Sequence, residues 1–180
     1  MATFGKTSDG ANSTSASADN KIASLAAPSS SGTVVSLTVR LWLSDTGSVA
    51  WKGVIYSDVA GVATALLAVT DEGTLTSTSE GDQTLNFSGA NLISITSGTS
   101  YWIGFHIADP GTPSWTFSRD GTASQRIVNG GDVYAGGTDD PWNPLDQTAL
   151  SGPIDCYVTY TEAGASTIPN PRRMMMGVGQ

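Results

Sequence analysis

The sequence predicts an all-β fold of antiparallel strands, and two observations carry this prediction. Short apolar runs rich in β-branched and aromatic residues recur between clusters of Gly, Ser, Asp and Pro, while helix signals are nearly absent. Thr33 to Leu43 also alternates, with Val35, Leu37, Val39, Leu41 and Leu43 on one side. Because the turns between runs are short, neighbouring strands should pair antiparallel in a sandwich or a barrel.

The run from Tyr101 to Ala108 is the strand that we expect at the centre of the fold. It is shorter than a typical buried helix, and turn residues bound it on both sides. Alternate side chains of a strand point to opposite faces, so one face should carry Tyr101, Ile103, Phe105 and Ile107. The other face should carry Trp102, Gly104 and His106. Both faces are therefore expected to be covered.

Further strands are expected along the rest of the chain. The strand ending at Leu43 should form a hairpin with Trp51 to Tyr56 through a turn at Ser44 to Ser48. Val62 to Thr70 could form a short helix, but its turn-rich flanks favour a strand. The remaining strands are expected at Gln83 to Phe87, Leu92 to Thr96, Ser114 to Phe117, Gln125 to Val128 and Ile154 to Thr161.

The chain is expected to form one body with two arms. Residues 1–31 read as an extended N-terminal arm with a first strand, residues 32–162 as the β-sandwich body, and residues 163–180 as an extended C-terminal docking arm. The first residues lack the apolar segment of a secretory signal, and no apolar run approaches about 18 residues, so no membrane partner is expected. The longest irregular segment, Asn129 to Pro153, is where binding would be expected.

Composition argues against a nucleic-acid partner. The formal charge is −8, and the eight Lys and Arg residues are scattered except for Arg172-Arg173. Binding to a phosphate backbone needs clustered positive charge. Charged residues make up only 13% of the chain, whereas Ser, Thr and Gly are abundant, as expected for a sheet surface solvated by hydroxyl groups.

The candidates for catalysis each have a simpler interpretation. Asp45-Thr46-Gly47-Ser48 is similar to the triplet of aspartic proteases, but only one copy is present and these residue types also suit a turn. The single His106 would have to serve any Ser-His-Asp or Cys-His site from within the central strand, where a partly buried, hydrogen-bonded role is expected. We therefore expect a non-enzymatic protein without a cofactor.

No metal site is expected either. The count of His and Cys excludes sites of that kind, whereas Asp132, Asp139, Asp140 and Asp146 could offer oxygen ligands to Ca²⁺. Their spacing matches no calcium loop, so solvated carboxylates are the preferred interpretation. Cys156 lies in an apolar strand pattern and should be buried as a small hydrophobic residue.

Aromatic residues in or near loops leave glycan binding open. The candidates are Trp115, Tyr134 and Trp142, with the polar residues Asp139, Asp140 and Asn143. An aromatic ring can stack on a sugar while polar groups bind its hydroxyls. Because Trp buries a large area, core or interface use of these tryptophans is favoured.

The C-terminal segment is a candidate for partner docking. Residues 1–162 carry a formal charge of −10 and residues 163–180 add +2. Pro169 and Pro171 favour an extended path, and methionines are adaptable apolar contacts. The expected docking residues are Arg172, Arg173, Met174, Met175 and Met176. We expect both terminal arms to be held by neighbouring subunits.

Several short motifs resemble a jelly-roll module of bacteriophage virion proteins and bacterial surface proteins. They are Phe4-Gly5-Lys6-Thr7, Gly32-Thr33-Val34, Val54-Ile55-Tyr56-Ser57-Asp58, Ala65-Leu66-Leu67-Ala68, Gly98 to Gly104 and Tyr157-Val158-Thr159-Tyr160. The resemblance implies a jelly-roll-like β-sandwich used for display, attachment or adhesion.

For this chain, the resemblance implies a structural protein of a virion that is assembled in the host cytoplasm. It would decorate or cement the capsid, or form part of a neck, tail or fibre, beside other virion proteins. A symmetric homo-oligomer is expected, with a trimer among the arrangements. The alternative is a carbohydrate-binding adhesin that attaches to host-surface glycans.

Overall fold

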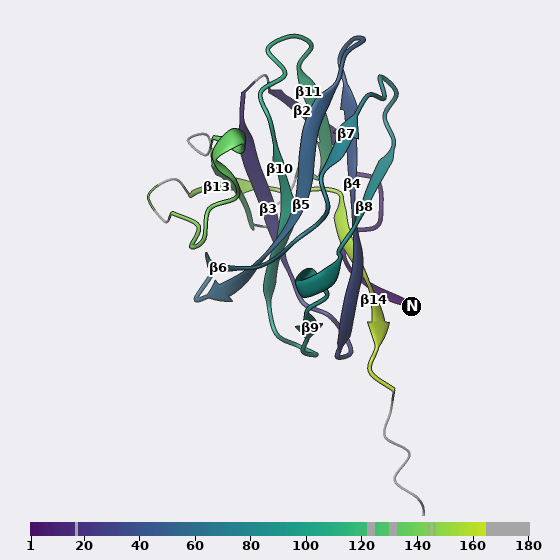
Figure 1. The fold of residues 1–180 in the computed structure, drawn as a ribbon, viewed down its shortest axis with the longest axis vertical. Coiled ribbons are helices and arrows are strands. Elements are labelled where there is room, and N and C mark those ends of the chain that lie inside the picture. The colour runs from purple at the N-terminus through teal and green to yellow at the C-terminus, as the bar shows by residue number, and fades with distance from the viewer. Residues whose placement is uncertain (17, 122–124, 130–132, 144, 146, 165–180) are drawn as a thin grey trace, which may run out of the picture.

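A computed structural model describes residues 1–16, 18–121, 125–129, 133–143, 145 and 147–164. It confirms the all-β prediction: two antiparallel sheets form a sandwich (Figure 1). The strands are β1 (Ala2–Gly5), β2 (Asn12–Ala16), β3 (Asn20–Ala26), β4 (Gly32–Leu43), β5 (Val49–Val59), β6 (Val62–Val69), β7 (Gly73–Leu75), β8 (Asp82–Asn86), β9 (Ser94–Ile95), β10 (Tyr101–Ile107), β11 (Trp115–Arg119), β12 (Gln125–Asn129), β13 (Thr148–Ser151) and β14 (Cys156–Glu162). Two 3-10 turns, η1 (Gly89–Asn91) and η2 (Tyr134–Gly136), complete the described elements.

The first sheet is built around β4, its longest strand. Along one edge β4 pairs with β14 and then β11, and along the other with β9 and β8. β1 lies outside β14, and β2 lies outside β11. A register shift between Thr159 and Tyr160 bends the pairing of β14 with β4, so that Val34 and Leu37 are both buried.

The second sheet has the order β13-β12-β3-β10-β5-β6, with β7 also paired to β5. β10 lies between β3 and β5, and all seven of its residues are buried, as predicted for Tyr101 to Ala108. Tyr101, Ile103, Phe105 and Ile107 face the sandwich core, whereas Trp102 packs in a second cluster on the opposite face. The predicted strand at Val62 to Thr70 is confirmed as β6.

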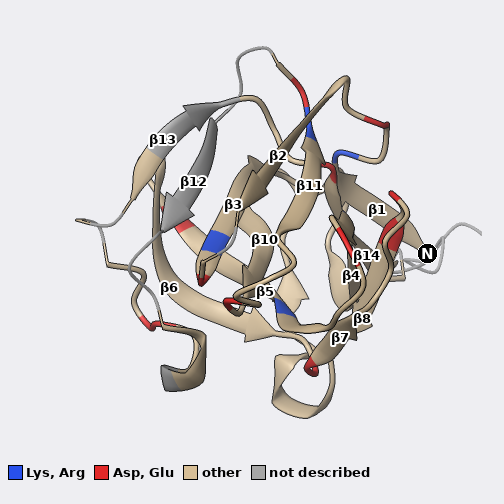
Figure 2. Ribbon diagram, turned by 90° about the horizontal axis from the view of Figure 1, so that it is seen from above, with Lys and Arg blue, Asp and Glu red and all other residues tan. Residues whose placement is uncertain are grey.

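Residues 1–31, expected as an arm with a first strand, contribute three strands to the sandwich. β1 and β2 extend the first sheet, and β3 pairs with β10 along its whole length (Figure 2). Ile22 and Ala23 are buried, so this segment is part of the body rather than an arm beside it. The abundance of Ser and Ala hid these strands because few large apolar residues mark their alternation.

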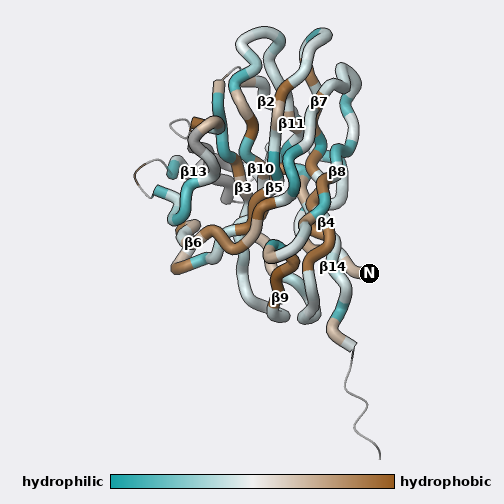
Figure 3. The backbone as a smooth tube through the Cα atoms, in the orientation of Figure 1, coloured by the Kyte–Doolittle hydropathy of each residue, from teal (hydrophilic) through white to brown (hydrophobic). Residues whose placement is uncertain are grey.

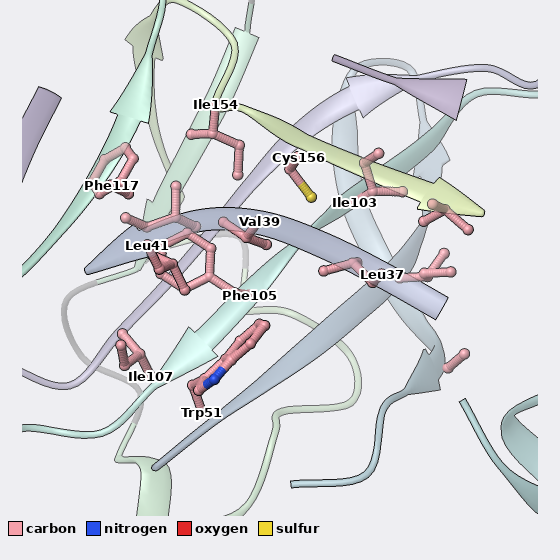
Figure 4. Packing of buried hydrophobic residues seen from close by; sticks show 14 of the residues in the cluster. Leu37, Val39, Leu41, Trp51, Ile103, Phe105, Ile107, Phe117, Ile154 and Cys156 are labelled. Carbon is pink, nitrogen blue, oxygen red and sulfur yellow. The ribbon is translucent and has the colours of Figure 1, made fainter. Parts of the chain in front are cut away.

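The predicted hairpin between Thr33–Leu43 and Trp51–Tyr56 is wrong. β4 belongs to the first sheet and β5 to the second, so the connection between them crosses from one sheet to the other. Leu41 of β4 and Trp51 of β5 reach the same core from opposite sides (Figure 4). Alternation shows which side chains face a core, but it does not show which strand is the neighbour.

The core between the sheets is rich in aromatic contacts. Phe105 of β10 meets the rings of Trp115 and Phe117 of β11 at centroid distances of 5.8 Å, both edge to face. Hydrophobic residues follow the central strands of both sheets, while the connecting turns are more polar (Figure 3). Cys156 is buried in this core, as predicted.

The outer face of the first sheet is hydroxylated. Thr38 bonds Thr84 at 2.8 Å, and Ser15 bonds Thr116 at 2.7 Å, each pair joining neighbouring strands. Ala2 lies opposite Tyr160, so the start of β1 and the end of β14 are at the same end of the sandwich (Figure 1).

Candidate functional site

The described residues between 133 and 147, named here the covering loop, lie against the outer face of the second sheet (Figure 1). It falls within the long segment Asn129 to Pro153 in which the sequence predicts binding. Within the described residues, its contacts involve β3, β10, β5 and β6. This loop is therefore the part of the molecule where candidate site residues meet.

Trp142 is the apolar anchor of the covering loop. Only 1% of its surface is exposed, and its ring lies 5.0 Å from that of Tyr56. Its cluster contains Ala23 and Val54, which flank Gly104 in the sheet register. Small residues at the middle of this face thus leave room for an indole from the loop.

Lys21 is fully buried beneath the covering loop. Its Nζ lies 4.6 Å from the ring centroid of Trp142, 5.4 Å from that of Tyr56 and 3.7 Å from Oδ2 of Asp139. A buried ammonium is costly unless nearby groups compensate for lost hydration, and the two rings and this carboxylate do so. The loop therefore stabilises the buried charge of Lys21, and Lys21 in turn helps to hold the loop on the sheet.

A second group of contacts fixes the start of the covering loop. The Tyr134 hydroxyl donates to Glu72 at 2.9 Å, and Lys52 pairs with Glu72 at 3.3 Å. The Tyr134 ring packs 4.9 Å from that of His106, whose Nδ1 is 3.2 Å from the Thr138 hydroxyl. The sequence predicts a partly buried histidine in the central strand, whereas His106 is fully buried because the covering loop lies over it.

These contacts shift the acidity of two groups. Burial, together with the bond to Glu72, raises the pKa of the Tyr134 hydroxyl well above its ordinary value of 10. The donated hydrogen bond from Tyr134 lowers the pKa of Glu72, and Lys52 lowers it further. Both shifts favour the arrangement in which Tyr134 is protonated and Glu72 is charged.

The covering loop also provides hydrogen-bond partners for backbone groups along the outer edge of β6. The Gln147 side chain accepts from Ala63 N at 3.2 Å and donates to Ala63 O at 2.7 Å. Leu66 N donates to Asp140 at 2.9 Å, and Trp142 N donates to the carbonyl oxygen of Thr64 at 2.8 Å. An exposed strand edge can pair with another chain, so the loop protects this one.

The structure does not support the predicted glycan residues as one exposed site. Trp115 is fully buried in the sandwich core, and Trp142 is buried under the loop, so neither ring offers a face for a sugar. The preferred alternative, core packing of these two tryptophans, is confirmed. Tyr134, Asp139 and Asp140 lie on the loop, where they bind the sheet as described above.

The remaining candidate residues occupy ordinary structural positions. Asn143 accepts from Leu145 N at 3.1 Å within the loop. Asp45 lies exposed in the connection between β4 and β5, and its Oδ1 accepts from Thr46 N at 2.7 Å. Burial, and to a smaller extent the charge of Asp155, raises the pKa of the Cys156 thiol.

Part of the calcium and docking predictions lies outside the described residues. Asp132, Asp146 and the expected docking residues Arg172, Arg173, Met174, Met175 and Met176 are in this group. Within the described ranges, no three His, Cys, Asp or Glu side chains are grouped so as to hold a metal ion. The same ranges contain no helix with the length and apolar character needed to cross a bilayer.

Comparisons with protein-family models, with curated proteins and with solved structures find no match to this chain.

Sequence reasoning missed two residues that position the covering loop, Lys21 and Gln147, and one that allows the strands beneath it to pair, Gly104. Each matters because of the group that lies opposite it, and only the topology identifies that group. One signal was present: Gly104 interrupts an otherwise bulky central strand, and a glycine there indicates close approach of another backbone.

Proposed function

We propose that this chain is a non-enzymatic structural protein of a bacteriophage virion, held in the particle by its C-terminal segment. The β-sandwich supports the body of this proposal, and the motif resemblance described above supports the virion context. The protein would decorate or cement the capsid, or form part of a neck, tail or fibre, as a homo-oligomer beside other virion proteins.

The contrast in charge and composition between the body and the C-terminal segment is the observation that carries the proposal. The described strands end with β14 at Glu162, after a body with a formal charge of −10. The segment beyond it adds +2 and contains Arg172-Arg173 followed by three methionines. Opposite charge and adaptable apolar side chains suit binding to an acidic protein neighbour.

Deleting residues 169–180 tests this proposal. Because no described strand includes these residues, the shortened chain should keep the circular dichroism spectrum and melting temperature of the full chain. When each form is expressed during phage assembly, only the full chain should be recovered in purified particles. Equal incorporation of both forms would contradict the docking role, and absence of both from particles would contradict the virion assignment.

A further inference from the structure

Trp42 is the one tryptophan of the chain whose ring is partly exposed. The other four are at most 2% exposed: Trp51, Trp102, Trp115 and Trp142. Trp42 lies between Leu41 and Leu43 of β4, which both face the core, so its side chain projects from the outer face of the first sheet. Because Trp has a large apolar surface that is usually buried, a ring left at the surface is a candidate contact for a ligand.

Tyr157 of β14 is a second partly exposed ring on this face. Its neighbours Cys156 and Val158 are buried in the core, so the Tyr157 side chain also points outward. The third partly exposed aromatic residue, Tyr134, packs on the second sheet with the covering loop, and the remaining Trp, Tyr and Phe rings are buried. The outer face of the first sheet therefore holds the two rings that remain available to a ligand.

Each of these two rings has a small hydroxyl residue beside it on the neighbouring strand. Tyr157 is opposite Thr38 of β4, which runs next to β14 (Figure 1), and Trp42 is opposite Thr116 of β11. Thr38 and Thr116 are only 3% and 5% exposed, although both belong to the outer face. Such burial is expected where a large cross-strand neighbour lies along the sheet, with its other face turned to solvent.

A group of charged side chains lies between the two rings. Arg40 precedes Trp42 by two residues on the same face of β4. Its guanidinium pairs with three carboxylates: Asp9 at 2.8 Å, Glu80 at 2.8 Å and Asp82 at 3.5 Å. All three carboxylates are at least 47% exposed, so they remain able to accept hydrogen bonds from hydroxyl groups. One positive and three negative groups give this cluster a formal charge of −2.

We propose that Trp42, Tyr157 and the Arg40 cluster, named here the aromatic face, bind an uncharged oligosaccharide. A sugar presents C–H groups that pack on an aromatic ring and hydroxyl groups that bind carboxylates and a guanidinium. Trp42 lies four residues along β4 from Thr38, the partner of Tyr157, which separates the two rings by about 14 Å. A chain of several sugar units therefore fits the face better than a single sugar.

The charge of the aromatic face selects among sugars. Its formal −2 repels sialic acids, uronic acids and sulfated sugars, whereas uncharged sugars meet no such penalty. The face also lies on the opposite side of the sandwich from the loop in which the sequence predicts glycan binding. This inference stands independently of the virion assignment.

Acrylamide quenching of tryptophan fluorescence tests the inference on the full chain. Because the other four tryptophans are buried, Trp42 should provide the accessible part of the signal. The probes are neutral oligosaccharides of glucose, galactose, mannose and N-acetylglucosamine, with sialylated and sulfated oligosaccharides for comparison. At least one neutral probe should protect the accessible tryptophan from quenching, and the acidic probes should not.

Variants then locate the contact for the neutral probe that binds. Trp42→Ala and Tyr157→Ala should each weaken its binding at least about tenfold in isothermal titration calorimetry. Trp42→Phe, which keeps a ring, should retain more affinity than Trp42→Ala. Tyr134→Ala is the matched control, because it removes the partly exposed ring of the second sheet and should leave binding unchanged. Circular dichroism verifies that each variant is folded.

Three results would overturn the inference: no neutral probe binds, only acidic probes bind, or Tyr134→Ala weakens binding as much as Trp42→Ala. Incorporation into particles is measured separately. Sugar binding by a protein that is absent from particles would support the aromatic face and reject the virion assignment. Incorporation into particles without sugar binding would reject the aromatic face and leave the proposed function standing.

Discussion

Trp142 and Gly104 both act at the outer face of the second sheet, but they pack against different neighbours. The indole from the covering loop fills a position over the sheet that the small residues of β3 and β10 leave open. At the same place, the strands β3 and β10 approach so closely that a Cβ on Gly104 would lie 1.9 Å from the carbonyl oxygen of Ile22. At the scale of single residues, Trp142 therefore anchors the loop on the sheet, and the missing side chain of Gly104 allows two strands of that sheet to pair.

Trp142→Ala should release the covering loop. Replacing a buried Trp by Ala costs roughly 3–5 kcal/mol, and here it also removes one ring that contacts Lys21. Urea denaturation should show this loss, and limited proteolysis should cut within residues 133–147. Trp42→Ala, at a half-buried residue of β4, provides the control, and an equal loss in both variants would contradict the anchoring role.

Gly104→Ala should prevent correct pairing of β3 with β10. The clashing atom is backbone, which cannot move without breaking the sheet, so we expect a loss of at least about 3 kcal/mol. Gly81→Ala is the matched control, because the nearest atom to its new Cβ is 3.9 Å away. Thermal melts of the two variants test this, and similar melting temperatures would show that the close approach does not matter.

Tyr134 should make stability fall at alkaline pH. Its pKa is raised in the folded protein, so the unfolded chain loses the phenolic proton first as the pH rises. The stabilisation is complete below about pH 10 and is lost progressively above it. Urea denaturation across this range should show a steeper decline for the natural protein than for Tyr134→Phe. Identical slopes would contradict the burial of the hydroxyl.

At the scale of elements, the sequence predicted individual strands better than their neighbours. The run Tyr101 to Ala108 was identified as the central strand because its composition alone indicates coverage on both faces. The partner of β4 could not be identified in this way, because alternation is the same whether β5 lies beside it or across the core. Residues 1–31 are predicted to hold one strand and form three, because their small residues carry a weak hydrophobic signal.

The candidate site was predicted only as a region. The sequence indicates that the segment around Tyr134 and Trp142 is a long loop, but not that it lies on the second sheet. Its Trp and Asp residues suit glycan binding and loop anchoring equally well, and only their burial and partners separate the two. Contacts between segments about 80 residues apart show that these residues anchor the loop.

The protected edge of β6 gives a prediction at this scale. Gln147→Ala should lower the free energy of unfolding by about 1–2 kcal/mol, because it leaves both backbone groups of Ala63 without their protein partner. Amide hydrogen exchange at Ala63 should become faster, while exchange in β10 should not change. Gln83→Ala on β8 is the control. Unchanged exchange at Ala63 would show that the loop does not protect this edge.

At the scale of the whole molecule, the two outer faces of the sandwich differ. Hydroxyl side chains pair between strands on the first sheet, whereas Trp142 of the covering loop packs on the second. The formal charge also differs along the chain: residues 1–162 carry −10 and residues 163–180 carry +2. Under the proposed function, this difference in charge would favour contact between the segment and an acidic neighbour.

Immunogold electron microscopy of the particle tests the central claim most directly. Antibodies raised against the folded body should label intact virions at regular positions, over the head for a decorating or cementing protein or at one end for a neck, tail or fibre protein. Particles lacking the gene for this chain are the control and should carry no label. Virions that bind no antibody, although the chain is present in the infected cell, would contradict the account.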